Sequence, residues 1–60
     1  MCEFKVFLGD EKVAEDVIYA KAEAHRVTLR DVLGKPVVVE GVRIMEVDVS
    51  STMLVLEKTD

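Results

Sequence analysis

The chain has little of what small domains use to hold themselves together without a partner. Among its 60 residues there is one cysteine, Cys2, so no disulfide can form within the chain, and there is no tryptophan and a single proline. A domain of this size buries only about 60% of the surface that its unfolded chain exposes, which makes a monomer marginally stable. We therefore expect a metal, a partner chain or both to contribute stability.

Basic residues are too few and too scattered for a typical nucleic-acid-binding surface. Eight lysines and arginines stand against twelve aspartates and glutamates, which gives a net charge of −4. Nucleic-acid binders usually carry a basic stripe, because phosphate contacts supply most of their affinity. Only Phe4, Phe7 and Tyr19 are available for stacking on bases. The composition therefore disfavours nucleic acid as a ligand.

Groups that carry catalysis are equally scarce. His25 is the only histidine, and the three glycines are isolated from one another, so neither a Ser/His/Asp arrangement nor a glycine-rich phosphate loop can be recognised. We predict that the protein is not an enzyme and that His25 lies in a turn without a metal. No signal peptide or membrane-spanning run is visible, so we expect a cytoplasmic protein in which Cys2 stays a free thiol.

Short apolar runs separated by turn signals dominate the rest of the chain. Their alternation and length predict strands at residues 2–8, 26–33, 37–39, 42–49 and 53–58. The strand 37–39 is expected to be buried, Leu33 to lie on the apolar face of its strand, and a bulge to fall near Ile44 and Met45. Half of the residues are hydrophobic, which is enough for a core. We predict one mostly-β domain over residues 1–60, built as a small barrel or sandwich.

Residues 13–24 are ambiguous. Val13, Val17, Ala20 and Ala24 have helical spacing, and the alanine and glutamate content favours a helix. The β-branched and aromatic run at 17–19 and the strict alternation at 20–24 favour a strand instead. The local pattern alone slightly favours the helix.

Cys2 is the residue with the most specific chemical potential. Its thiolate is a strong ligand for nickel, copper and zinc. The terminal amine of Met1 and the amide nitrogen of Cys2 lie within five-membered chelate rings of one another and of the sulfur, and the amide nitrogen of Glu3 is a weaker donor. One chain therefore supplies two or three donors, and a second chain would complete a square-planar nickel site. The competing interpretation is a core cysteine on the apolar face of the first strand.

The chain as a whole resembles a known family. The features that carry the resemblance are, in order, Met1–Cys2, Lys5–Leu8, Glu15–Val17, Val27–Gly34, Val39–Ile44, Glu46–Asp48 and Leu54–Glu57. Together they resemble the CooT-type family of small nickel-binding proteins, which is named for an accessory protein of carbon monoxide dehydrogenase maturation. Each segment is weak alone, and their order with the Met-Cys start makes the match.

The resemblance implies a fold, an assembly and a ligand. The fold would be an all-β small barrel of roughly five to seven strands, similar to the Src-homology-3 and Sm folds, with residues 13–24 as strand. The protein would be a homodimer that binds nickel through Cys2 of both chains, for a nickel-enzyme client. Such families have also been labelled predicted RNA-binding proteins. The alternatives to a nickel-binding accessory protein are therefore an RNA- or protein-binding barrel without a metal role, or an interaction module without a small ligand.

Overall fold

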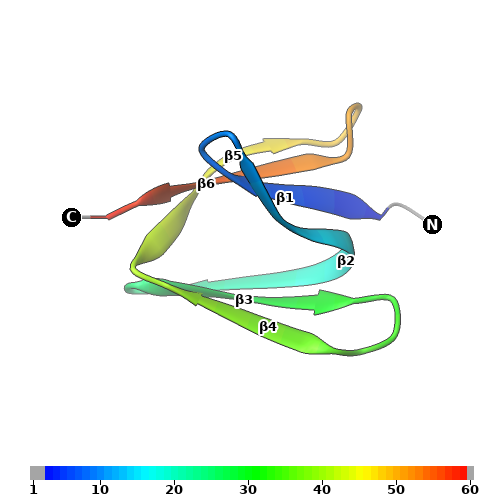
Figure 1. Cartoon of the computed structure of the whole chain (residues 1–60), viewed down its shortest axis with the longest axis horizontal. Helices are drawn as coiled ribbons and strands as arrows, with labels where there is room; N and C mark the ends of the chain where they lie inside the picture. Colours follow the sequence, from blue (N-terminus) through cyan, green and yellow to red (C-terminus); the bar gives the residue numbers. More distant parts are fainter. Residues whose placement is uncertain (1–2, 60) are drawn as a thin grey trace.

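The computed structural model describes residues 3–59, which form strands joined by turns and contain no helix. The strands are β1 (Phe4–Leu8), β2 (Glu11–Glu23), β3 (Arg26–Asp31), β4 (Pro36–Glu40), β5 (Val42–Asp48) and β6 (Met53–Lys58). They form one six-stranded sheet in the order β4-β3-β2-β1-β6-β5 (Figure 1). All neighbours are antiparallel except β1 and β6, which run parallel. The all-β prediction is confirmed.

The longest strand, β2, shows that the helix favoured locally for residues 13–24 is wrong. Its first part pairs with β1, where Ala14 lies opposite Val6, and its second part pairs with β3, where Ala20 lies opposite Leu29. Partners on both sides supply hydrogen bonds and burial that a short alanine-rich helix would lack. Strand pairing therefore overrides the local helix propensity.

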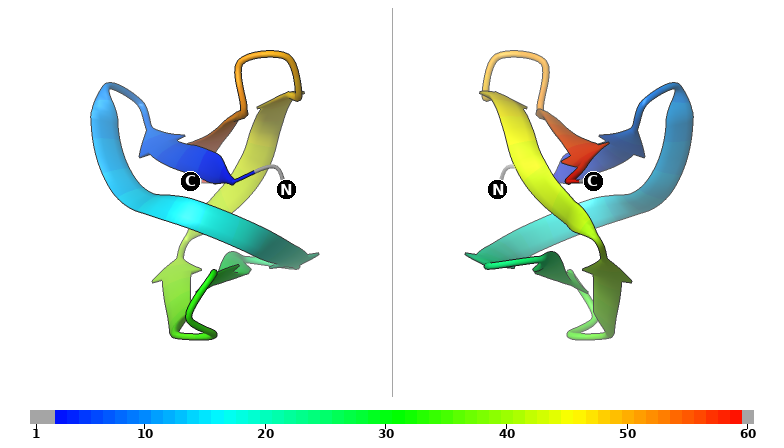
Figure 2. Two further views of the ribbon diagram at one scale, coloured as in Figure 1. Left: turned by 90° about the vertical axis from the view of Figure 1, so that its right-hand side faces the viewer. Right: turned by 90° about the vertical axis from the view of Figure 1, so that its left-hand side faces the viewer.

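A bend in the middle of β2 folds the sheet over on itself. Asp16 has a positive φ of 58°, and the pairing register shifts between Val17 and Tyr19. Such a bulge increases the local twist and bends the strand. As a result β1, β5, β6 and the first part of β2 form one layer, and the rest of β2 with β3 and β4 forms the other (Figures 1 and 2).

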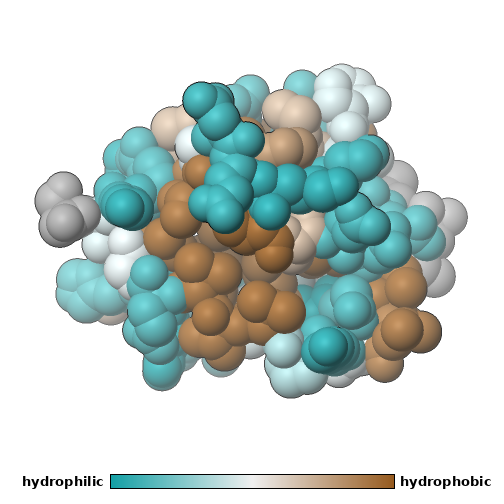
Figure 3. Space-filling view, viewed as in Figure 1, coloured by the Kyte–Doolittle hydropathy of each residue, from teal (hydrophilic) through white to brown (hydrophobic). Residues whose placement is uncertain are grey.

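The core lies between these two layers. Val6, Val27 and Leu29 are completely buried, and the other buried hydrophobic residues are Val17, Val42, Leu54 and Leu56. Phe4 and Leu8 pack against this cluster from the same face of β1 as Val6, as their alternation predicted. Hydrophobic surface is also visible across the middle of the face shown in Figure 3.

The sheet curls but is not closed. Its border strands β4 and β5 are not hydrogen-bonded to each other within residues 3–59, so the barrel implied by the resemblance is not a closed one. Within β5 the register shifts between Ile44 and Glu46, which confirms the predicted bulge. No helix able to cross a membrane is found in the described part of the chain.

Two burial predictions are wrong, each for its own reason. Val37 and Val38 are exposed because β4 is a border strand that pairs only with β3, whereas Val39 in the same strand is half-buried and packs against the core. Leu33 is 88% exposed because β3 ends at Asp31 and Leu33 belongs to the turn that follows.

The turn between β2 and β3 and the link between β4 and β5 lie side by side. His25 is in the turn, as predicted, and its carbonyl accepts a hydrogen bond from Gly41 N–H. Gly41 has a φ of +70°, a conformation that glycine adopts without steric cost, and its carbonyl accepts a hydrogen bond from Thr59 N–H at 3.1 Å. Gly41 thus connects the two layers.

Candidate functional site: the N-terminal end of the sheet

The proposed metal-binding residues fall at the start of the chain. Met1 and Cys2 lie outside the described residues, so the structure does not bear on their arrangement. Glu3 is the first described residue; it is exposed and leads directly into β1. The described surroundings of Glu3 therefore define what lies next to the candidate ligands.

Three other segments meet the start of β1 at this end of the molecule. Lys5 N–H donates to the carbonyl of Thr52 in the turn after β5, at 2.9 Å. Val32 N–H, in the turn after β3, donates to the carbonyl of Asp16 at the bend of β2, at 3.0 Å. Figure 1 shows these turns and the start of β1 at the same end of the longest axis. We call the start of β1, the bend of β2 and the turns 32–35 and 49–52 the N-terminal end.

An apolar groove opens beside the start of β1. It has a volume of about 270 Å³ and is lined by Phe4, Val17, Ile18, Tyr19, Ala20, Ile44, Val47 and Leu54. These residues come from β1, β2, β5 and β6, and none of them carries a charge. The groove therefore suits an apolar side chain rather than a charged ligand.

Large hydrophobic side chains gather around this groove. Ile18, Tyr19 and Val47 on its walls are exposed, and so are Val32, Leu33 and Val49 in the adjoining turns. The hydrophobic surface at the lower right of Figure 3 lies where Figure 1 places the turn after β3. Exposed apolar side chains clustered in this way mark surfaces that contact another molecule.

The turns at this end are held by aspartate side chains. Oδ1 of Asp31 accepts hydrogen bonds from Leu33 N–H at 2.9 Å and from Lys35 N–H at 3.0 Å. In the turn after β5, Oδ1 of Asp48 accepts hydrogen bonds from the Ser50 hydroxyl and from Ser51 N–H. The Ser50 hydroxyl, and then the Ser51 amide, lower the pKa of Asp48, because they stabilise its charged form. These hydrogen bonds give both turns defined shapes.

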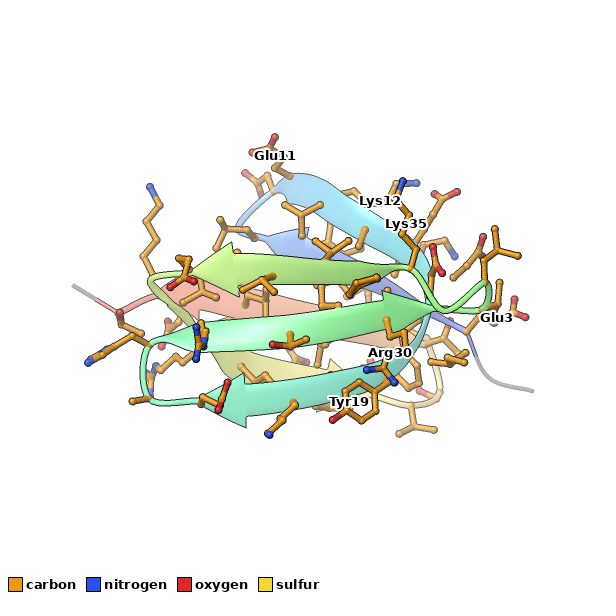
Figure 4. All side chains as sticks on the ribbon, turned by 90° about the horizontal axis from the view of Figure 1, so that it is seen from below. Glu3, Glu11, Lys12, Tyr19, Arg30 and Lys35 are labelled. Carbon is orange, nitrogen blue, oxygen red and sulfur yellow. The ribbon has the colours of Figure 1, made fainter. Side chains whose placement is uncertain are left out.

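One pair at this end was not anticipated from the sequence. The guanidinium carbon of Arg30 on β3 lies 4.8 Å from the ring centroid of Tyr19 on β2. Figure 4 shows the two side chains next to each other on the outer surface of the layer formed by β3, β4 and the second part of β2. The sequence contains the aromatic ring and the cation, but only the register of β2 and β3, which places Tyr19 opposite Arg30, brings them together.

The single histidine lies at the opposite end of the molecule. A shallow polar hollow there is lined by Glu23, Ala24, His25, Arg26 and Glu40. Its charges pair with one another, since Arg26 lies 3.1 Å from Glu23 and 3.8 Å from Glu40. Within residues 3–59 no three His, Cys, Asp or Glu side chains are grouped so that they could hold a metal ion.

Comparison with known proteins adds the family. The sequence model of the CooT family, described as CO dehydrogenase accessory protein CooT, matches residues 1–57. The chain belongs to the CooT family. The match covers nearly the whole chain, including Met1 and Cys2, and confirms the resemblance seen in the sequence. A search of curated proteins found no match.

Membership of the CooT family implies an accessory role toward carbon monoxide dehydrogenase. The description names an accessory protein rather than a catalyst, which agrees with the scarcity of catalytic groups in the sequence.

Proposed function

We propose that this CooT-family protein binds nickel as a homodimer through its N-terminus, and holds or delivers the metal for a nickel enzyme such as carbon monoxide dehydrogenase. The observation that carries the proposal is the family match over residues 1–57, which includes Cys2. The protein would act in the cytoplasm, where the Cys2 thiol stays reduced and available to a metal.

The donors at the N-terminus fit nickel chemically. Cys2 offers a thiolate, and the amine of Met1 and the amide of Cys2 offer nitrogens in adjoining five-membered rings. The amide nitrogen of Glu3 is a weaker donor. Because one terminus supplies two or three donors, two termini would complete a planar site, which gives one nickel per dimer. Copper and zinc would compete, copper most strongly by the general order of affinities.

The described surroundings support an association between two copies near the N-terminus. Glu3 directly precedes β1, whose first residue, Phe4, lines a groove without charged residues. Six of the exposed large hydrophobic side chains lie on the walls of this groove or in the adjoining turns. A domain of this size without a disulfide gains from covering such a surface. A two-fold axis near the start of β1 would cover it and bring two Cys2 residues to one metal.

The test is a nickel titration of the untagged protein, followed by calorimetry and by thiolate-to-metal charge-transfer absorption. We expect one nickel per two chains, and we expect Cys2→Ser to abolish binding because a hydroxyl stays protonated near neutral pH. Affinity should rise with pH, because the thiol and the amine must lose protons before they donate. A Cys2→Ser variant that binds like the wild type would refute the proposal.

His25→Ala is the matched control, since it removes the only imidazole while leaving the N-terminus unchanged. It should bind nickel as the wild type does. A tag placed before Met1 should alter affinity or absorption, because it replaces the free amine. Light scattering at micromolar concentration should return a dimer, and a monomer both with and without nickel would contradict the proposed assembly.

A further inference from the structure

The outer side of β4 is a strand edge without a neighbour in the part of the chain that the structure describes. β4 is the first strand in the sheet order and pairs only with β3 (Figures 1 and 4). Proteins usually blunt such edges with bulges or charges. The other edge, β5, has a bulge at Met45 and carries Glu46 and Asp48. β4 has Pro36 and Glu40 at its two ends, but it pairs without a register shift and its middle consists of three valines, so the middle of its edge is open to another strand.

The hydrogen bonds to β3 show which groups of β4 point outward. Gly41 N–H donates to His25 O, and Asp31 N–H donates to Lys35 O, so these pairs are hydrogen-bonded positions of the ladder. Hydrogen-bonded and non-hydrogen-bonded pairs alternate in an antiparallel ladder. Val37 and Val39 therefore bond to β3, whereas the N–H and C=O groups of Val38 and Glu40 and the C=O of Pro36 face away from it.

We propose that this edge pairs antiparallel with β4 of a second copy, around a two-fold axis at Val38. Val38 would exchange both of its backbone hydrogen bonds with its counterpart. Glu40 N–H would donate to the carbonyl of Pro36 in the other copy. Because proline has no N–H, the only hydrogen bond lost is the one that Pro36 would otherwise donate to the carbonyl of Glu40. The pattern is self-complementary, as a two-fold contact requires.

Charge complementarity favours a second copy as the occupant. On the outer surface, Arg30 lies beside Pro36 at one end of β4, and Glu40 lies at the other end. Arg26 is shared between Glu40 and Glu23, which leaves that end net negative. Antiparallel pairing places Arg30 of one copy about two strand spacings, ~10 Å, from Glu40 of the other, within reach of an electrostatic attraction at low salt.

This contact is separate from the proposed nickel site. A two-fold axis at the middle of β4 sends the N-terminal ends of the two copies in opposite directions along the longest axis, which measures 33 Å. It cannot bring two N-termini to one metal. The edge is short, so the association is weak and adds to any dimer formed at the N-terminal end.

The experiment uses charges placed on the proposed axis. Val38 is 51% exposed and its backbone groups face outward, so Val38→Lys and Val38→Glu leave the β3–β4 hydrogen bonds in place. Each variant alone sets like charges opposite each other across the axis, whereas an equal mixture sets opposite charges there. We expect the association constant of the mixture to exceed that of either variant alone by about fivefold or more.

The measurement is sedimentation equilibrium of metal-free protein at low salt, up to about millimolar concentration, in a Cys2→Ser background so that the outcome does not depend on nickel. Met45→Lys and Met45→Glu are the matched controls, because Met45 is 53% exposed on the other edge strand. Their mixture should show no gain. Equal mean mass for the two Val38 variants and their mixture, with circular dichroism showing all of them folded, would overturn the proposal, and a partner of another kind would then have to be sought for this edge.

Discussion

Two leucines four positions apart should differ sharply in how much stability they lose when each is replaced by alanine. Leu29 is completely buried in β3, between Ala20 on β2 and Val37 on β4, whereas Leu33 is 88% exposed in the following turn. Truncating a buried leucine to alanine costs about 2–5 kcal/mol. A chain of 60 residues has a total stability of about 3–9 kcal/mol. Leu29→Ala should therefore remove roughly a quarter of the stability at the least, and all of it if the chain lies at the low end of this range.

For Leu33→Ala we expect the free energy of unfolding to change by no more than about 0.5 kcal/mol. The leucine side chain buries almost no surface, and the N–H of residue 33 keeps its hydrogen bond to Asp31. The assay is urea unfolding followed by circular dichroism, at several protein concentrations. A cost for Leu33→Ala equal to that for Leu29→Ala at the lowest concentration would refute the exposure assigned to this turn. A cost that grows with protein concentration would instead show that association covers Leu33.

Other perturbations test the turns, the bend and the ligand class. The lowered pKa of Asp48 means that its contribution to stability is present above its ordinary pKa of 3.8 and is lost as pH falls through the lower folded value. Acid titrations should therefore show the wild type losing more stability below pH 3.8 than Asp48→Asn does. Asp16→Gly should raise the free energy of unfolding by about 1 kcal/mol or less, because glycine adopts the positive φ of 58° more easily, and Asp16→Val should lower it by about 1–2 kcal/mol; equal thermal midpoints for the two would contradict the bend. With a net charge of −4, gel shifts with generic RNA should be weak and vanish at moderate salt, and a salt-resistant shift would promote the RNA-binding alternative.

Most strands could be predicted because alternation is a local property. The turn at His25, the bulge near Ile44 and the final strand at 53–58 are all visible as pattern breaks or alternation in the sequence. Residues 13–24 could not be assigned this way, because their partners on β1 and β3 lie elsewhere in the chain. The predicted burial failed similarly for Val37 and Val38, since a run of valines fits an interior strand and a border strand equally well.

For the candidate site, too, the local features could be predicted and the features that depend on the fold could not. The thiol chemistry of Cys2 and the family resemblance were available from the sequence, and the family is confirmed over residues 1–57. The apolar groove was not predictable, because Phe4, Ile18 and Ile44 meet only after the sheet has bent at Asp16. The nickel ligands themselves stay a prediction.

The place of β6 has a consequence for the order in which the protein folds. β6 lies between β1 and β5, parallel to the first and antiparallel to the second, and it supplies Leu54 and Leu56 to the core. During synthesis β6 therefore emerges from the ribosome only after the other five strands of residues 3–59. Contacts between distant parts of a chain slow folding. A nascent chain can form the β2–β3–β4 meander early, but β1 and β5 cannot be joined into one layer until β6 has been made.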